Sequence, residues 1–349
     1  MRKIASLVVV LGIGGVGLLS GQSAQQPTPR PGVTVPGVKI PVTKLEPIAV
    51  FDIPGAPDWM VVDEHVWISN SPKNNVTRVD PQTNRVVESI TVGARPCSGL
   101  AAGFGSLWVP NCGDKTVSRV DLRTGSVTAT WPATIGNSEG GVAVGAGSFW
   151  MMTDAKGTLV RIDPATNNTI AAIRIAPGSY AVAFGNDAVW ITSTEQNLLT
   201  RLNTKTNAVE ATIPIGQRPR FLAVGEGSVW TLNQGDGSIS RVDMKTNKVV
   251  ATIEAGIPGD GGEIAVGEGS VWATVLGFPL TRIDPISNRV AQQFFGVGGD
   301  SVRVGHGSVW LTDLRGGKLL RLDPKRIEAA KPDLAEFRPR SRRAHCPEP

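Results

Sequence analysis

The chain has 349 residues, a formal net charge of +5 and three cysteines, and 41% of its residues are hydrophobic. This apolar content excludes disorder over most of the chain, and so few cysteines exclude a small disulfide-stabilised scaffold. Two of the net positive charges lie at Arg2 and Lys3 and three in residues 324–349, so the body between them is neutral. A neutral body lacks the dense basic face that nucleic acids require, and we expect no nucleic-acid partner.

Residues 1–24 have the form of a secretory signal peptide. Two basic residues precede an apolar run from Ile4 to Leu19, and small residues follow up to Ala24. The run is about 16 residues long, which is shorter than the roughly 20 that span a bilayer as a helix. We therefore predict an exported protein, periplasmic or extracellular. An uncleaved signal anchor is the alternative, and it would be the one contact with a membrane.

Two further segments flank the predicted globular part. Residues 25–46 contain five prolines and no helical periodicity, and are predicted to form an extended linker that trails from the body. Residues 325–349 are basic and contain prolines, and are predicted to form a disordered tail that is either solvated or bound to an acidic surface. Cys346 lies in this tail, and the sequence leaves open whether it is free or paired with another chain.

A tryptophan recurs seven times at intervals of 38 to 42 residues. In most copies a glycine-rich step precedes it, as in GEGSVW, and ten or eleven residues later come Arg, an aliphatic residue and Asp or Asn, as in Arg241-Val242-Asp243. A turn such as PQTN or MKTN follows, and then a β-branched run such as VVATI. The repeated tryptophans are Trp67, Trp108, Trp150, Trp190, Trp230, Trp272 and Trp310.

Each repeat predicts four short antiparallel strands, because alternating β-branched runs are separated by Gly, Asn and Asp turns. Four strands in about 40 residues, repeated radially, are typical of a β-propeller blade. We predict an all-β, seven-bladed propeller over residues 47–324. The seventh copy lacks a fourth strand, and residues 48–54 match it, so an N-terminal strand is predicted to complete the last blade. A double-sheet sandwich is the alternative, but it would not require equal registers.

These repeats resemble the YVTN-type, YncE-like propellers, and also the streptogramin B (virginiamycin B) lyase-like propellers, which share the G-x-G-x-[LV]-W step. The resemblance implies a seven-bladed propeller. Lyase activity in that family implies a histidine general base and a metal-bound substrate at the loop face. Here His65 and His306 fall in turns on the opposite face, and His345 lies in the tail. We therefore assign no catalytic residue.

The loops that enter the blades vary between copies, and we expect a small molecule or a protein to bind there. Several positions are bulky or charged where other copies have Gly or Ala. Arg218 and Arg220 together could clamp a carboxylate or a phosphate. The ligand-binding candidates are Asp58, Trp59, Glu139, Tyr180, Arg218, Arg220, Phe221, Glu263 and Asp300.

No cofactor is predicted, but a ring of acidic residues around the channel mouth leaves room for Ca²⁺ or Mg²⁺, which prefer oxygen ligands. No loop has the alternating spacing of a dedicated calcium site. The acidic residues in question are Glu139, Asp154, Asp260, Glu263, Asp300 and Asp313. Arg303 replaces the alanine of five other copies, and is expected to reach the channel or to form an ion pair.

Cys97 and Cys112 lie in two loops of one repeat that are expected on the same face, so we predict a disulfide between them.

The sequence supports two hypotheses of function. The first is an exported monomer that acts as a ligand- or protein-binding scaffold. The second is a metal-dependent lyase or a quinoprotein-type enzyme at the channel mouth.

Overall fold

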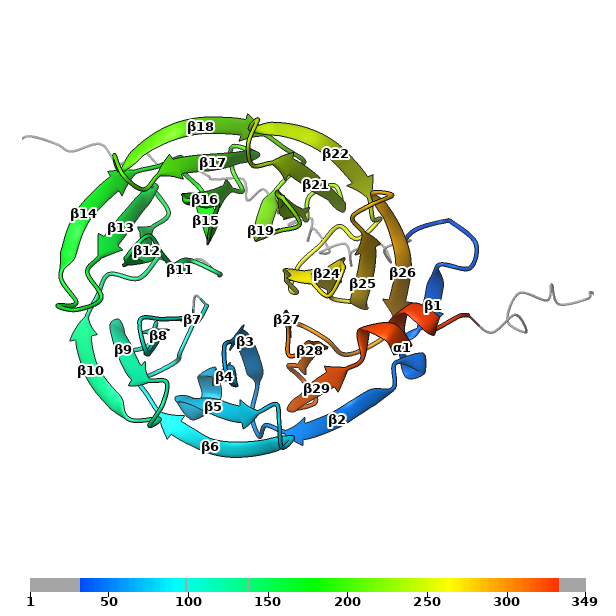
Figure 1. Ribbon diagram of the computed structural model, residues 1–349, viewed down its shortest axis with the longest axis horizontal. Coiled ribbons are helices and arrows are strands. Elements are labelled where there is room, and N and C mark those ends of the chain that lie inside the picture. The colour runs from blue at the N-terminus through cyan, green and yellow to red at the C-terminus, as the bar shows by residue number, and fades with distance from the viewer. Residues whose placement is uncertain (1–31, 98, 137–138, 333–349) are drawn as a thin grey trace, which may run out of the picture.

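The computed structural model describes residues 32–97, 99–136 and 139–332, which form seven small sheets arranged radially around a central axis (Figure 1). This confirms the predicted seven-bladed propeller. The predicted signal peptide, residues 333–349 and with them Cys346 lie outside the described residues. Within the described ranges, no helix has the length and apolar character needed to cross a membrane.

Each blade is a four-stranded antiparallel sheet whose first strand lies nearest the axis, along what we call the channel, and whose fourth lies at the rim (Figure 1). Blades one to three contain β3 (Pro57–Val62), β4 (Val66–Asn70), β5 (Asn75–Asp80), β6 (Arg85–Thr91); β7 (Ala101–Gly103), β8 (Ser106–Asn111), β9 (Thr116–Asp121), β10 (Val127–Pro132); and β11 (Val142–Gly145), β12 (Ser148–Asp154), β13 (Thr158–Ile162), β14 (Thr169–Arg174). Blades four and five contain β15 (Ser179–Gly185), β16 (Ala188–Ser193), β17 (Leu198–Asn203), β18 (Ala208–Pro214); and β19 (Pro219–Gly225), β20 (Ser228–Asn233), β21 (Ser238–Asp243), β22 (Lys248–Glu254). Blades six and seven contain β23 (Ile264–Gly267), β24 (Ser270–Val275), β25 (Phe278–Asp284), β26 (Arg289–Phe295); and β27 (Val302–Gly305), β28 (Ser308–Asp313), β29 (Lys318–Leu322). The remaining elements are β1 (Lys39–Pro41), β2 (Pro47–Asp52), the 3₁₀ helices η1 (Val42–Lys44) and η2 (Ser71–Lys73), and α1 (Pro324–Ala329).

The ring closes through β2, which pairs antiparallel with β29 and gives the seventh blade its fourth strand. Val50, for example, lies opposite Leu320. The prediction that an N-terminal strand completes the last blade is confirmed. Because the first and last segments of the propeller share one sheet, β29 is paired on both sides and offers no open edge.

The seventh blade needs this strand because its third-to-fourth-strand turn is different. In the other six blades an Asn or Gly near the end of this turn has a left-handed backbone, with φ between 54° and 73°. A β-branched residue avoids that conformation. The seventh copy has Ile327 at this position, and the chain continues as α1 instead of reversing. The six turn residues are Asn84, Gly125, Asn167, Asn207, Asn247 and Asn288.

The repeated tryptophans and arginines join the blades to one another. All seven tryptophans are fully buried, and six of the repeat arginines lie over the tryptophan of their own blade at 4.7 to 5.4 Å from the ring centroid. The same six arginines donate a hydrogen bond to a carbonyl in the third-to-fourth-strand turn of the next blade. At the seam between blades six and seven, Arg282 instead donates to Gln292 and to Glu328 of α1.

We expect Arg241→Ala to lower the free energy of unfolding by about 2–3 kcal/mol, because it removes charge-assisted hydrogen bonds and a cation–π contact. Arg241 Nη1 donates to Pro285 O at 2.6 Å and to Asn288 Oδ1 at 2.9 Å. Denaturant unfolding measures the change, and Arg174→Ala is the control because Arg174 is exposed on β14. If both variants unfold at the wild-type midpoint, the arginines do not hold the blades together.

Residues 32–46 do not trail from the body, so the predicted linker is wrong for this part. β1 adds to the edge of blade six in parallel with β26, and Ile40 is fully buried. Gln293 of β26 is also fully buried; its Oε1 accepts a hydrogen bond from Val33 N at 2.8 Å, and its Nε2 donates to Ala255 O at 2.9 Å. The segment is held because it satisfies backbone groups at an otherwise open sheet edge.

The predicted disordered tail is likewise wrong for its first residues. Asp323 caps α1 by accepting a hydrogen bond from Lys325 N, and Ile327 is buried against the propeller. Gln292 Nε2 donates to Glu328 O at 3.0 Å. Gln293 thus holds the N-terminal segment and Gln292 holds α1. At the equivalent positions of the fourth strand, most other blades have small residues such as Ala or Thr.

Candidate functional site: the channel mouth

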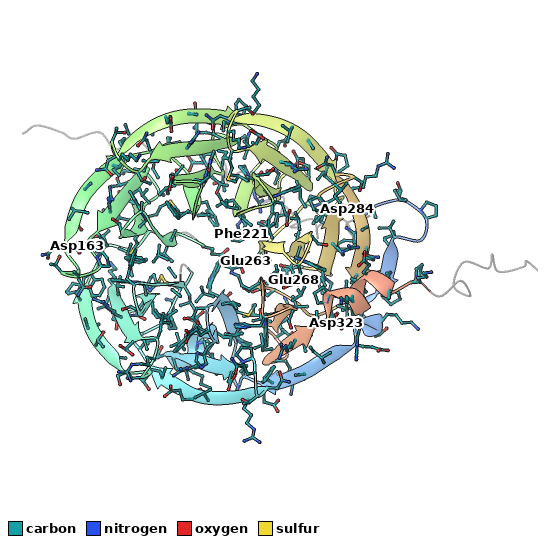
Figure 2. The ribbon with its side chains drawn as sticks, viewed as in Figure 1. Asp163, Phe221, Glu263, Glu268, Asp284 and Asp323 are labelled. Carbon is teal, nitrogen blue, oxygen red and sulfur yellow. A yellow bond between two sulfur atoms is a disulfide. The ribbon has the colours of Figure 1, made fainter. Side chains whose placement is uncertain are left out.

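Side chains from six blades meet at one end of the channel. Figure 2 shows two of them, Phe221 and Glu263, near the centre of the ring, whereas Asp163 and Asp284 lie at the outer rim. The first strands and the loops that enter them supply the group, because these are the parts of each blade nearest the axis (Figure 1). Its members are Asp58 and Trp59 of β3, Glu139, Tyr180 of β15, Arg220 and Phe221 of β19, Glu263 and Asp300.

One part of the mouth is a network around Glu139. Tyr180 Oη donates a hydrogen bond to Glu139 Oε2 at 2.9 Å. Arg220 Nη2 donates to the same carboxylate and, at 2.5 Å, to Tyr180 Oη. Burial and the Glu139 charge raise the pKa of Tyr180 to about 12, so this hydroxyl keeps its proton at neutral pH. The network holds Arg220 as a fixed, already paired cation.

Arg218 and Arg220 do not form an open clamp for an anion. Arg218 Nη2 pairs with Asp260, and Arg220 Nη1 lies 3.5 Å from the same carboxylate. Arg220 Nη1 also donates to Gln234 Oε1 at 3.2 Å. Gln234 was not among the predicted site residues, because a single polar residue after a strand end does not stand out from turn formers.

Trp59 and Phe221 lie deeper in the channel. Only 4% of Trp59 and 3% of Phe221 is exposed, and their rings lie 5.9 Å apart. Trp59 is therefore mainly a packing residue of the channel, as Phe221 is, although Trp59 is among the residues that line two small cavities.

Glu263 forms a buried ion pair with Arg303, which confirms the expectation that Arg303 pairs with a neighbour. Arg303 Nη2 lies 2.5 Å from Glu263 Oε1, and Ser301 Oγ donates to Oε2. Burial raises the pKa of Glu263, while Arg303 and Ser301 act against that shift. Glu263 is therefore a mouth carboxylate that is already paired.

Asp58 and Asp300 form a carboxyl pair. Burial, together with the negative charges of Asp300, Glu139 and Glu263, raises the pKa of Asp58 to about 8. This pKa favours the protonated form of Asp58, which hydrogen-bonds to Asp300. Burial raises the pKa of Asp300 as well, while the hydrogen bonds from Gly262 and Asp58 and the charge of Arg220 act against that shift. Asp300 Oδ1 accepts a second hydrogen bond from Gly262 N at 3.0 Å. Among the described residues, no Lys or Arg forms an ion pair with either carboxyl group.

A cavity of about 30 Å³ opens at this pair, lined by Asp58, Trp59, Glu139, Glu263 and Asp300 among others. A second cavity of about 50 Å³ lies beyond Trp59, between Phe221 and Arg303. One water needs roughly 10–15 Å³ on this measure, so each cavity holds a few small groups at most.

The described residues contain no group of three or more His, Cys, Asp or Glu side chains with the geometry to hold a metal ion. Two of the six acidic residues considered for a metal, Asp154 and Asp313, lie at the ends of β12 and β28, where Asp313 accepts a hydrogen bond from Gly316 N. His65 and His306 lie in first-to-second-strand turns, as predicted, and His306 Nε2 lies 2.7 Å from Asp63 O.

Cys97 and Cys112 form the predicted disulfide, with their Cα atoms 5.8 Å apart. Backbone hydrogen bonds from Cys97 N to Pro110 O and from Cys112 N to Arg95 O hold the two loops in register.

We expect Cys97→Ser/Cys112→Ser to lower the free energy of unfolding by about 3 kcal/mol, the loop-closure value for a loop of this length. Denaturant unfolding with and without reductant measures it, and reductant should then have no further effect on the variant. Three free thiols in the unfolded wild-type protein would show that the bond does not form.

Comparison with known proteins finds neither a matching family model nor a matching curated protein. Solved structures do match. A streptogramin B lyase is 19% identical with a TM-score of 0.66, covering 80% of this chain and 97% of its own. A virginiamycin B lyase from Staphylococcus aureus is 16% identical with a TM-score of 0.65, covering 78% and 98%. A catalytically inactive variant of the Staphylococcus aureus enzyme with quinupristin is 15% identical with a TM-score of 0.66, covering 80% and 98%. At these identities the likeness shows a shared fold, a seven-bladed propeller of the virginiamycin B lyase type.

Proposed function

We propose that the protein is an exported binding propeller that takes a cationic group of its ligand, an ammonium or a guanidinium, between Asp58 and Asp300. The observation that carries the proposal is the carboxyl pair itself: Asp58 and Asp300 line one cavity, burial favours a proton on Asp58, and Arg220, whose charge acts on Asp300, is already paired with Glu139 and Asp260. A bound cation would replace that proton, and carboxylate oxygens accept strong, charge-assisted hydrogen bonds from it.

The cavity is large enough to enclose the cationic group of a ligand but too small to enclose a whole ligand. A cavity of about 30 Å³ accommodates an ammonium group, which is close to water in size, beside the ring of Trp59. The rest of the ligand would lie outside, over the loop face. This arrangement suits the side chain of a peptide or protein as well as a small amine.

An amine fits better than a divalent metal. The described acidic residues at the mouth do not form a set of three metal ligands, and Glu139 and Glu263 are already paired with Arg220 and Arg303. We therefore derive no reaction step through a metal.

Export and a monomeric state are part of the proposal. The Cys97–Cys112 disulfide supports an oxidising compartment, since such bonds are rare in reducing ones. A metal-dependent lyase is the second candidate. It rests on the fold likeness, and the two described histidines lie on the opposite face from the mouth.

A thermal-shift screen tests the proposal with four classes of compound: amines (n-butylamine, cadaverine, spermidine and arginine amide), divalent metals, pyrroloquinoline quinone and cyclic depsipeptides. We expect stabilisation by at least one amine, lost in Asp58→Asn/Asp300→Asn and kept in Glu226→Gln, a control on an exposed turn of the opposite face. Stabilisation by metal or depsipeptide instead, with product formation, would favour the lyase. No amine shift would refute the cationic site.

A further inference from the structure

A groove lies at the outer edge of blade six, between the two terminal segments. Figure 1 shows α1 beside β1 at this edge, far from the channel. One wall is the chain at Lys44, Leu45 and Glu46, and the other is α1 with the residues that follow it, to Lys331. The groove has a volume of about 310 Å³, at the lower end of the range for ligand pockets.

Both walls are attached to the propeller, so the groove is preformed. α1 is tied to blade six by Arg282 Nη2, which donates to Glu328 Oε1 at 3.0 Å, and by Gln292, which donates to the carbonyl of the same residue. The other wall follows directly from β1, and Leu45 N donates to Val42 O at 2.9 Å. A preformed groove spares a ligand the cost of ordering it.

The groove combines an apolar floor with a basic rim. Leu45, Ile327 and Ala330 supply the floor, and they are buried or half-buried. Lys44, Arg326 and Lys331 are exposed on the rim, and Glu46 is the one acidic residue among those that line the groove. Arg326 lies 3.9 Å from Asp323, a distance that leaves its guanidinium open to other acceptors.

We propose that this groove binds an acidic peptide segment, with an apolar side chain on the floor and carboxylates at Arg326 and Lys331. Charge complementarity selects an acidic ligand, and the concave apolar floor selects a peptide over a flat anionic lipid surface. The proposal is independent of the channel mouth, because the two sites share no residue.

Fluorescence anisotropy on the full chain tests it, with a labelled peptide of alternating glutamate and leucine as the probe. A peptide of alternating lysine and leucine serves as the charge control. We expect the acidic peptide to bind and the basic one not to. Arg326→Glu/Lys331→Glu should weaken binding about tenfold or more, whereas Lys325→Glu, on the same helix but outside the groove, should not. Raising the salt concentration should also weaken it.

Equal binding of both peptides, no binding of either, or full binding by the double variant would each overturn the proposal. Vesicles containing phosphatidylserine test whether the groove binds an anionic lipid surface instead. Binding to these vesicles without binding to the acidic peptide would overturn the proposal in favour of a lipid surface. The thermal shift with amines should persist in Arg326→Glu/Lys331→Glu. This distinguishes a failure of the groove proposal from a failure of the proposed cationic site at the channel mouth.

Discussion

Asp58→Asn should make the protein more stable than wild type at pH 8 and should remove part of the pH dependence of its stability. The folded protein holds a proton on Asp58, whose pKa is about 8, against an ordinary value of 3.8 in the unfolded chain. Between these values the folded state binds more protons, so wild-type stability falls as the pH rises towards 8 and levels off above it. Each pH unit contributes up to about 1.4 kcal/mol.

The asparagine amide has no charge to bury and can still donate a hydrogen bond to Asp300. We therefore expect the variant to gain about 2 kcal/mol or more at pH 8 and little at pH 4. Denaturant unfolding between pH 4 and 8 measures the effect. In this range the turn aspartates Asp80, Asp121, Asp243 and Asp284 stay ionised, because hydrogen bonds lower their pKa. Parallel pH profiles for both proteins would show that Asp58 is not protonated in the folded state.

Glu263→Ala should be the most destabilising change at the mouth, with a cost of about 3 kcal/mol or more, because it leaves the charge of Arg303 partly buried without its partner. Only 6% of the Glu263 side chain and 26% of the Arg303 side chain is exposed. Denaturant unfolding measures the loss.

The double variant Glu263→Ala/Arg303→Ala is the matched control. It restores the alanine that five other blades carry at the Arg303 register, and removing both partners of a buried pair is far less costly than removing one. We expect it to recover most of the lost stability. If the two single effects simply add, the ion pair contributes no coupling energy.

The fold was predictable because each of the seven repeats shows the same pattern of strands and turns. Seven copies place tryptophan, arginine and a turn at one register, so errors in a single copy do not change the result. The role of the repeat arginine was not predictable, since its acceptor lies about 45 residues away in the next blade. The terminal segments were misread for a related reason. Residues 32–46 contain prolines and follow no repeat, so the sequence did not indicate a strand there, and it is the open edge of β26 that gives Ile40 its partner.

The composition of the candidate site was partly predictable. Bulky or charged residues in place of Gly or Ala indicated Tyr180, Arg220, Phe221 and Glu263, because the loops that carry them vary while the strands do not. What the sequence did not show is which of them pair. The pairs depend on the distances across the ring: Arg220 forms an ion pair with Glu139 two blades away, and Asp58 hydrogen-bonds to Asp300 of the adjacent blade.

Calorimetric titration of the wild-type protein with an amine at pH 7, in two buffers of different ionisation enthalpy, tests the cationic site most directly. We predict that binding releases a proton from the Asp58–Asp300 pair and that affinity rises with pH up to about 8, the pKa of Asp58. In Asp58→Asn/Asp300→Asn both the binding heat and the proton release should disappear. Binding that releases no proton, or that persists in the double variant, would contradict this account of the channel mouth.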